Sequence, residues 1–456
     1  MLERDSLPLL GKALDRLAEG FAELPPAEDT PIDRVLLQRV LFDVAERMRD
    51  NFPYFHPLYA GQMLKPPHPV ARLAYQLALW INPNNHALDG GRASLQMEKE
   101  AVAALARMIG WETHLGHLCG GGTMANLEAL WVAGRLRPGA AVVASRQAHY
   151  THGRVCAVLG LPFEAVACDG RGRMDVAALQ QLLDRREVGT VVATIGTTAI
   201  GSVDPLPELL ALRDRYGFRL HADAACGGYF GLAANLAPDT ARTYAQLAGA
   251  DSLVIDPHKH GLQPYGCGCV LFRDPSVGRF YDHESPYTYF SSGDLHLGEI
   301  SLECSRPGAA AVALWATQRL LPLEKGGAFS RALSDGRAAA LALFERLRDD
   351  ARFVTAFAPE LDIVVWAPRA RRASEASEIS RCIFAEAARR GLHLALAELP
   401  VEWFAAAGME PDQPALTCLR SVLMKPEHRA WIDRIWEILE QSTTAVTGAG
   451  PGPLSR

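Results

Sequence analysis

From about residue 95 onwards, short apolar runs alternate with amphipathic segments. "SLQMEKEAVAALARMIGW" has the apolar period of a helix, and "GGGTMANLEALWVAGRL" opens with glycines and then follows the same period. Five runs are short, apolar and bounded by turn residues, as buried strands are: "AAVVAS", "GTVVATIG", "FRLHAD", "DSLVID" and "CGCVLFRD". Strands that alternate with helices predict an α/β domain with a mostly parallel sheet flanked by helices.

The pattern of apolar and polar residues changes after about residue 310. "GAAAVALWATQRLL", "RALSDGRAAALALFERLRDD", "ISRCIFAEAARRG" and "EHRAWIDRIWEILEQ" predict helices, whereas "LDIVVWAP" and "TCLRSVLMKP" predict strands. We therefore expect a large domain over 61–324, a small C-terminal α/β domain over 325–445 and a disordered tail over 446–456. Residues 1–60 read as a helical N-terminal segment with a proline-rich break at "ELPPAEDTPID".

Composition narrows the class of protein. The 456 residues are 49% hydrophobic and exceed one ordinary domain. A balance of 46 basic against 52 acidic residues predicts no nucleic-acid binding. We see no apolar stretch of about 18 residues, so we expect no membrane span, and the start of the chain does not resemble a signal peptide. The nine cysteines show no paired spacing, so we expect a cytoplasmic protein without a metal site.

Lys259 stands out because it is one of only six lysines in an arginine-rich chain. It follows the predicted strand "DSLVID", and a partly desolvated lysine can lose its proton and act as a nucleophile, which arginine does not. Asp223 ends the predicted strand "FRLHAD", and a buried carboxylate needs a partner. A protonated ring nitrogen of a ligand would serve, as would an internal salt bridge. Ala224 and Ala225 leave room for a flat ligand.

Three further segments offer polar groups at predicted strand ends. In "CGGGTMAN", Gly122 and Thr123 open a helix, and exposed N–H groups there favour a phosphate, although an ordinary capped turn has the same sequence. His149 and His152 could stack on a ring or exchange protons near neutral pH, or could be structural. Thr198, in "ATIGTTAIG", offers a hydroxyl at a glycine turn, or plain turn chemistry.

These signals converge on one cofactor. A phosphate cradle, an acid for a pyridinium nitrogen, a stacking histidine and a lysine at a strand end are together what pyridoxal 5′-phosphate (PLP) requires. Ligands of α/β sheets collect at the carboxyl ends of the strands, where these residues are expected to lie.

The sequence also resembles the group II PLP-dependent amino-acid decarboxylases, which include aromatic amino-acid, glutamate, cysteine sulfinate and archaeal tyrosine decarboxylases. "HADAACGG" resembles the aspartate motif of that family and "DSLVIDPHKHG" its lysine motif, and the resemblance runs from about residue 50 to 440. It implies the aspartate-aminotransferase-like fold (PLP fold type I), with a mostly parallel seven-stranded sheet. It also implies a homodimer with active sites at the interface, and an N-terminal segment that packs on the partner subunit.

The resemblance also implies a role for individual residues. Lys259 would be the Schiff-base lysine that forms the internal aldimine, Asp223 would pair with the pyridine nitrogen, and Ala225 would lie against the ring. His149 would stack on the other ring face and sense the substrate carboxylate. The phosphate would be bound by Gly122, Thr123 and His258, and Thr198 would lie near the ring hydroxyl.

The reaction that the resemblance implies is α-decarboxylation of an L-amino acid to its amine and CO2. In the segment "RFYDHESPYTYFSSGD", "ESPY" resembles the archaeal tyrosine decarboxylases, which makes Tyr287 the candidate acid for Cα and Tyr289 the second candidate. Both tyrosines could instead pack a dimer interface. Other outcomes stay open: oxidative deamination to an aldehyde, transamination, carbon–sulfur lysis, or PLP binding without catalysis.

The resemblance places substrate contacts in the segment "NFPYFHPLYAGQM" and the loop "NPNNHALDGGRAS". The candidate contacts there are Phe55, Tyr59, His86 and Ala87. An aromatic pocket would favour an aromatic or apolar substrate, whereas His86 or an arginine such as Arg92 would favour an acidic one. Arg306, in "LECSRPGAAAVALWA", which resembles the family's arginine motif, could meet a carboxylate or hold the base of the preceding loop. The run "NPNNHALDGGR" departs from the aromatic amino-acid decarboxylases, which argues against dopa or tryptophan as the substrate.

Overall fold

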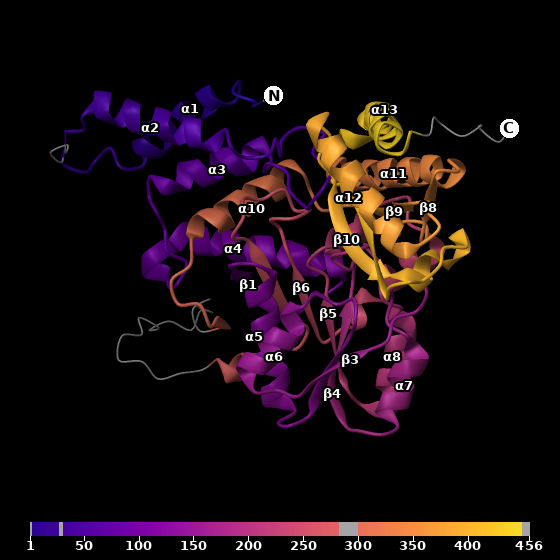
Figure 1. Ribbon diagram of the computed structural model, residues 1–456. Helices are drawn as coiled ribbons and strands as arrows, with labels where there is room; N and C mark the ends of the chain where they lie inside the picture. The colour runs from indigo at the N-terminus through magenta and orange to yellow at the C-terminus, as the bar shows by residue number, and fades with distance from the viewer. Residues whose placement is uncertain (1, 27–30, 282–299, 449–456) are drawn as a thin grey trace.

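A seven-stranded sheet forms the centre of the larger part of the molecule (Figure 1). The computed structural model describes residues 2–26, 31–281 and 300–448. The strand order is β1 (Leu115–Cys119), β7 (Gly268–Phe272), β6 (Ser252–Ile255), β5 (Arg219–Asp223), β4 (Val188–Thr194), β2 (Ala141–Ser145), β3 (Phe163–Val166). Only β7 runs antiparallel to its neighbours β1 and β6, so the predicted mostly parallel sheet is confirmed.

Helices cover both faces of this sheet. One face carries α5 (Gly122–Leu136) and α6 (Thr151–Leu159). The small side chains of Ala125 and Ala129, both in α5, pack on β1 and β7. The other face packs against a larger apolar cluster that includes Leu105, Leu209 and Leu314. The helices of that side are α4 (Leu88–Ile109), α7 (Val176–Leu183), α8 (Leu206–Tyr216) and α10 (Gly308–Leu320), with α3 (Pro69–Leu79) packed on α10 and α9 (Pro238–Ala245) beside α8. The short 3₁₀ helices are η1 (Gly228–Leu232), η2 (Leu247–Gly249) and η3 (Pro275–Phe280).

A smaller part of the molecule holds a four-stranded antiparallel sheet in the order β10 (Ala395–Pro400), β11 (Ala415–Val422), β9 (Ile363–Pro368), β8 (Phe353–Thr355). Its helices are α11 (Ala328–Asp349), α12 (Ala373–Arg389) and α13 (His428–Thr447), and η5 (Val401–Ala407) lies beside β10. These elements agree with the small α/β domain expected from the sequence. Helix α13 continues through Val446 and Thr447, which the sequence had assigned to a disordered tail.

The segment before α3 also contributes to this smaller part. Ala60 donates its backbone N–H to His393 and accepts one from Val422, and its side chain belongs to the same apolar cluster as Leu343 and Ile435. The C-terminal apolar core is therefore completed by residues from near the start of the chain.

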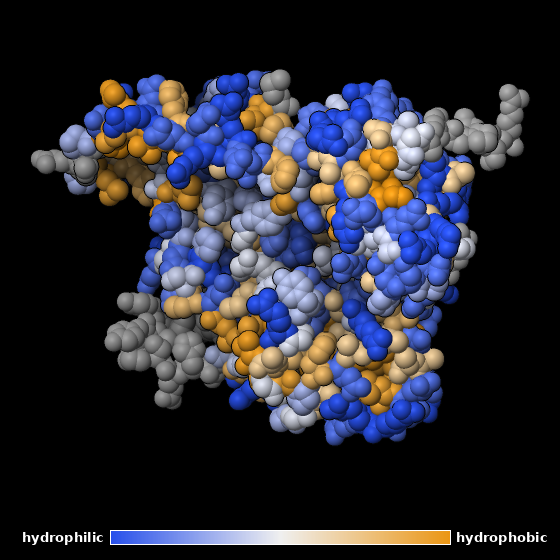
Figure 2. All heavy atoms as spheres, viewed as in Figure 1, coloured by the Kyte–Doolittle hydropathy of each residue, from blue (hydrophilic) through white to orange (hydrophobic). Residues whose placement is uncertain are grey.

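Helices α1 (Leu7–Glu19) and α2 (Arg34–Met48) project from the body, at the upper left of Figure 1, and neither has a buried residue. Apolar side chains nevertheless recur along α2 at Leu37, Leu41, Val44 and Met48, which are 45%, 56%, 51% and 62% exposed. Figure 2 shows the corresponding orange atoms on that projection. A row of this spacing forms one face of a helix, so α2 presents an uncovered apolar face.

One sequence expectation needs correction: "NPNNHALDGGRAS" is only in part a loop. Helix α4 already begins at Leu88. Asn84 and Asn85 form hydrogen bonds to the first turns of this helix, to the carbonyls of Gly90 and Ser94. The helix is kinked at Gly91, which has φ −165° and ψ 58°. Within the part of the chain that the structure describes, no helix is long and apolar enough to cross a membrane.

Candidate functional site

The polar residues singled out in the sequence meet at one edge of the large sheet. They follow the carboxyl ends of β1, β2, β4, β5 and β6 and line a pocket of about 560 Å³. The pocket lining includes Gly120, Gly121, Gly122, Thr123, His149, Thr198, Asp223, Ala225, Asp256, His258, Lys259 and Glu303. Eight of the predicted site residues are thus brought together from five separate strand ends.

Lys259 lies in the turn after β6 and is held by an acid that the sequence did not single out. Its Nζ lies 3.0 Å from Asp256 Oδ2, and the Asp256 side chain is 2% exposed. Burial by itself would lower the pKa of Lys259, but Cys226, Asp256 and Asp223 raise it above the ordinary lysine value. The neighbouring Asp256 carboxylate therefore stabilises the ammonium form of Lys259 against the effect of burial.

Asp223, at the end of β5, is buried opposite a histidine. His152 Nε2 lies 2.9 Å from Asp223 Oδ2, and the other carboxylate oxygen accepts the Ala225 N–H at 3.2 Å. Burial alone would raise the pKa of Asp223, but the hydrogen bond and charge of His152 and the charge of Lys259 hold it below its usual range. Of the two histidines in "AHYTHG", His152 thus has a structural contact with the acid, which keeps Asp223 ionised inside the protein.

A second buried histidine stands behind this pair. His221, on β5, contacts Asn126 Oδ1 and Ser252 Oγ at 2.9 Å each. Burial lowers the pKa of His221 to about 3, so its ring is neutral at physiological pH. The positive charge of Lys259 near Asp223 is therefore not supplemented by His221.

Glycines bring the start of α5 against the Lys259 turn. A Cβ on Gly122 would lie 2.7 Å from Asp256 Oδ2, and one on Gly121 would lie 3.1 Å from the His258 ring. No side chain caps α5, and His258 Nδ1 is buried without a hydrogen-bond partner among the described residues. Free N–H groups at a helix start and an unpartnered imidazole nitrogen fit the phosphate of PLP, so the residues present suit the cofactor that the sequence implies.

His149 and Thr198 both line the same pocket. His149 stacks against Tyr150, with ring centroids 4.3 Å apart, and burial lowers its pKa below the usual histidine value. The turn of Thr198 is fixed from the small domain, because Arg420 donates to the carbonyls of Thr198 and Ala199 at 2.6 and 2.8 Å. Ala225, 8% exposed, forms part of the pocket floor.

The predicted substrate residues lie outside this pocket within one chain. Tyr59 is 5% exposed and packs edge-on against Tyr54 at 4.9 Å, while Phe55 lines a different cavity at the domain junction. His86 Nδ1 lies 3.5 Å from Cys304 Sγ, next to the pocket residue Glu303. Arg92 is exposed, and Ala87 is buried at the start of α4.

Arg306 has protein partners for its charge. Its guanidinium forms a buried ion pair with Glu98 at 2.6 Å and donates to the carbonyls of Leu118 and Asn85 at 2.8 and 3.0 Å. The side chains of Arg306 and Glu98 are 4% and 1% exposed. In this structure Arg306 ties α4, β1 and the start of α10 together, and it does not reach the pocket.

Tyr287 and Tyr289 lie outside the described residues, so their assignment as proton donors stays a prediction. Sequence reasoning missed Asp256 and Glu303. Asp256 stands three residues before Lys259 in the same turn, and Glu303 accepts the Gly120 N–H at 3.0 Å. The spacing of Asp256 and Lys259 was visible in "DPHK", but their contact depends on the turn. No group of three or more metal-binding side chains occurs among the described residues.

Comparison with known proteins adds independent information. A family model described as the pyridoxal-dependent decarboxylase conserved domain matches residues 131–368. The "Probable L-tyrosine/L-aspartate decarboxylase" of Methanothermobacter thermautotrophicus is 31% identical over 270 residues, which cover 57% of this chain and 70% of that protein. The L-aspartate decarboxylase of Thermococcus kodakarensis is 31% identical over 284 residues, which cover 61% of this chain and 72% of that protein.

A solved structure agrees with the predicted fold. The crystal structure of Oryza sativa TDC with PLP and tryptamine superposes with a TM-score of 0.76 at 19% identity, and covers 97% of this chain and 99% of that chain. At this level of identity the likeness shows the fold alone. It confirms the fold class expected from the sequence, a mostly parallel seven-stranded sheet with a smaller domain.

Proposed function

Since this chain belongs to the pyridoxal-dependent decarboxylases, and uses PLP to decarboxylate an amino acid, we propose that Lys259 is the residue to which PLP is attached and that the product is the corresponding amine. The observation that carries this proposal is the convergence of Lys259, Asp223 and the glycine turn at Gly121–Gly122 on one pocket. A lysine, an acid for the ring nitrogen and a phosphate cradle are the three requirements for holding PLP.

Different residues of the chain have different roles in the proposed reaction. Bound PLP supplies an electron sink for the bond between Cα and the carboxylate. Asp223, kept ionised by His152, holds a proton at the ring nitrogen. Lys259 Nζ must pass its proton to a neighbour before it can bond to carbon, and Asp256 Oδ2, at 3.0 Å, is placed to take it. The N–H groups of Gly122 and Thr123, with His258, bind the phosphate, and His149 covers the ring.

We propose L-tyrosine as a better substrate than L-aspartate. The names of the relatives include both amino acids. Among the described residues that line the pocket there is no arginine, and Glu303 adds a carboxylate. The lysine of that lining, Lys259, is the proposed attachment point of PLP, so a second substrate carboxylate would have no separate cationic partner in the described lining, and an unpaired desolvated charge is costly. Tyr287 is proposed as the proton donor to Cα on the strength of its sequence alone.

We further propose that the protein is a cytoplasmic homodimer. The uncovered apolar face of α2 supports a second copy as its partner, since large exposed apolar patches mark interaction surfaces. All nine cysteines are free, and Cys304 and Cys382 are exposed, which suits a reducing compartment.

Lys259→Ala tests the cofactor assignment. We expect the purified variant to lack the absorbance band of lysine-bound PLP and to release no CO2 from any amino acid, because no other described residue lining the pocket carries an amine. Spectra and CO2 release would be measured with the parent protein over a panel that includes tyrosine and aspartate. Lys325→Ala, at an exposed lysine, is the control. Normal turnover by Lys259→Ala would refute the assignment, and faster turnover of aspartate than of tyrosine by the parent would refute the substrate preference.

A further inference from the structure

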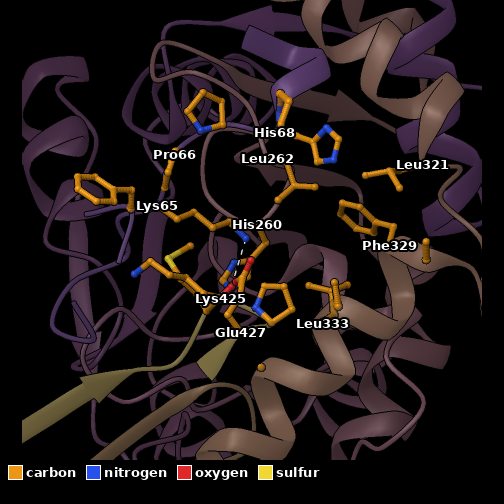
Figure 3. Close-up of a pocket in the computed structure, with 18 of the residues that line it drawn as sticks. Lys65, Pro66, His68, His260, Leu262, Leu321, Phe329, Leu333, Lys425 and Glu427 are labelled. Atoms are coloured by element: carbon orange, nitrogen blue, oxygen red, sulfur yellow. Dashed lines mark hydrogen bonds between the residues drawn. The ribbon is translucent and has the colours of Figure 1, made fainter. Parts of the chain in front are cut away.

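A second cavity, of about 490 Å³, lies where the two domains meet, and the function proposed above makes no use of it (Figure 3). It is lined by residues before α3, by the turn after Lys259, by α11 and by the segment after β11. Its position is behind the catalytic turn, because His260, which follows Lys259 in the chain, is one of its walls. Two of the six lysines of the chain, Lys65 and Lys425, also line it.

The surroundings of Lys65 supply fewer hydrogen-bond acceptors than its ammonium group has donors. Figure 3 shows its side chain reaching into the middle of the cavity, with the amino group beside His260. The ammonium group has three N–H donors, but Nζ has one hydrogen-bond acceptor in the described part of the chain, the Met424 carbonyl at 3.2 Å. Burial lowers the pKa of Lys65 to about 8, although Asp362 and Glu427 act in the opposite direction.

The other polar groups of the wall leave a surplus of donors. Asp362 is already engaged, because its Oδ2 lies 2.8 Å from His260 Nε2, and His260 Nδ1 is buried without a partner among the described residues. Lys425, 4% exposed, donates to the Tyr59 carbonyl at 2.6 Å, and burial lowers its pKa to about 7. Glu427 is exposed at the rim. Arg72 and Glu3, which also line the cavity, form an ion pair with each other at 2.6 Å, so neither is free to serve Lys65.

The rest of the wall is apolar. Leu262, Leu321, Phe329 and Leu333 stand together on one side of the cavity in Figure 3, across from Lys65. Phe329 and Leu333 are 3% and 6% exposed, so this side is firmly packed from behind. Small-molecule sites characteristically combine such apolar walls with a few convergent polar groups.

We propose that this cavity is a second small-molecule site, which binds an organic monocarboxylate with an apolar body. The carboxylate accepts hydrogen bonds from Lys65 Nζ, whose donors are otherwise only partly used, and the apolar body packs against Leu262, Phe329 and Leu333. Charge-assisted hydrogen bonds to a carboxylate are the stronger kind, and the enclosed wall keeps water from competing with them.

The test is calorimetric titration of the PLP-loaded protein with 3-phenylpropanoate, and with its neutral analogue 3-phenylpropanamide. We expect saturable binding of the acid, one molecule per chain, and binding of the amide weaker by roughly tenfold or more, the loss expected when a charge-assisted contact is removed. Lys65→Met should weaken binding of the acid by a similar factor. Lys325→Met, at an exposed lysine outside the cavity, should leave binding unchanged.

A second variant keeps the test valid if Lys65→Met does not fold. Ala332→Phe fills the apolar side from α11 while both lysines remain, and it should abolish binding of the acid. Absence of binding to the parent protein would overturn the proposal. So would equal affinity in the parent, Lys65→Met and Ala332→Phe, since the acid would then occupy another site, such as the PLP pocket. Neither result depends on the catalytic role of Lys259.

Discussion

In the PLP pocket, the pKa values of individual residues are shifted by their contacts with neighbouring residues. Lys259 and Asp223 both stay charged because Asp256 and His152 lie within 3.0 Å of them. Their places at strand ends were predictable, because Asp223 ends one short strand-like run of the sequence and Lys259 closely follows another. The proton on Lys259 was not predictable, since it depends on a carboxylate that only the folded turn brings near.

The neutral histidine behind this pair predicts a pH dependence of stability. The pKa of His221 is about 3 in the folded protein because of burial, against about 6.5 when unfolded. Between these values the unfolded chain binds the extra proton, so stability falls as the pH falls from about 6.5 towards 3, by roughly 1.4 kcal/mol per unit for this group. Denaturant unfolding of the cofactor-free protein at pH 7, 6 and 5 would measure the slope.

His221→Gln is the comparison for that experiment, because it retains hydrogen-bonding groups towards Asn126 and Ser252 and does not titrate. We expect its stability to vary less steeply with pH than that of the parent. Identical slopes for the two proteins would show that His221 is not a source of the acid sensitivity.

At the level of elements, the buried contact of Arg306 joins α4, β1 and the start of α10. Arg306→Met leaves Glu98 buried without its ion pair, which costs about 3–5 kcal/mol in other proteins. Arg319→Met breaks the exposed pair with Glu100 and should cost about 1 kcal/mol or less. Unfolding in denaturant compares the two variants. If Arg306 instead meets the substrate carboxylate, Arg306→Met would raise KM and leave the free energy of unfolding near that of Arg319→Met.

The approach of α5 to the Lys259 turn depends on Gly121, whose φ is +144°. Gly121→Ala adds backbone strain of about 1–2 kcal/mol and a Cβ 3.1 Å from the His258 ring, so we expect PLP affinity to fall about tenfold. Cofactor release followed by fluorescence would measure it. Gly139→Ala is the matched control, since Gly139 has φ +78° and open space around its Cβ. Equal PLP affinity in the two variants would exclude Gly121 from the cradle.

The sequence predicted the inner strands of the large sheet but not its two edge strands, β1 and β3. Strands β2, β4, β5, β6 and β7 come from continuous apolar runs, which are buried on both faces. Strand β1, "LGHLC", contains Gly116 and His117, and β3 has four residues at the sheet edge, so neither shows a clear pattern. The antiparallel direction of β7 could not be predicted from its own residues, because it is defined by the pairing of β7 with β1 and β6.

At the level of the whole molecule, the apolar face of α2 predicts how copies associate. Leu41→Glu with Val44→Glu puts two charges on that face and should yield monomers in analytical ultracentrifugation, where we expect the parent to sediment as a dimer. Arg39→Glu changes the net charge by the same amount on the opposite side of the helix, and should leave the dimer intact. A parent protein that sediments as a monomer would contradict the assignment of this face.

The backbone of Tyr59 and Ala60, within the small domain, has a consequence for how the protein is made. Lys425 reaches the Tyr59 carbonyl across 366 positions of sequence, and Ala60 pairs with His393 and Val422. On the ribosome, residues 59–60 emerge long before those partners exist, so the core of the small domain closes only after Lys425 has been synthesised. Contacts this distant are slow to form. The early segment must therefore stay extended and accessible while the large sheet folds, which is a window for chaperone binding and for exchange of the segment between two nascent chains.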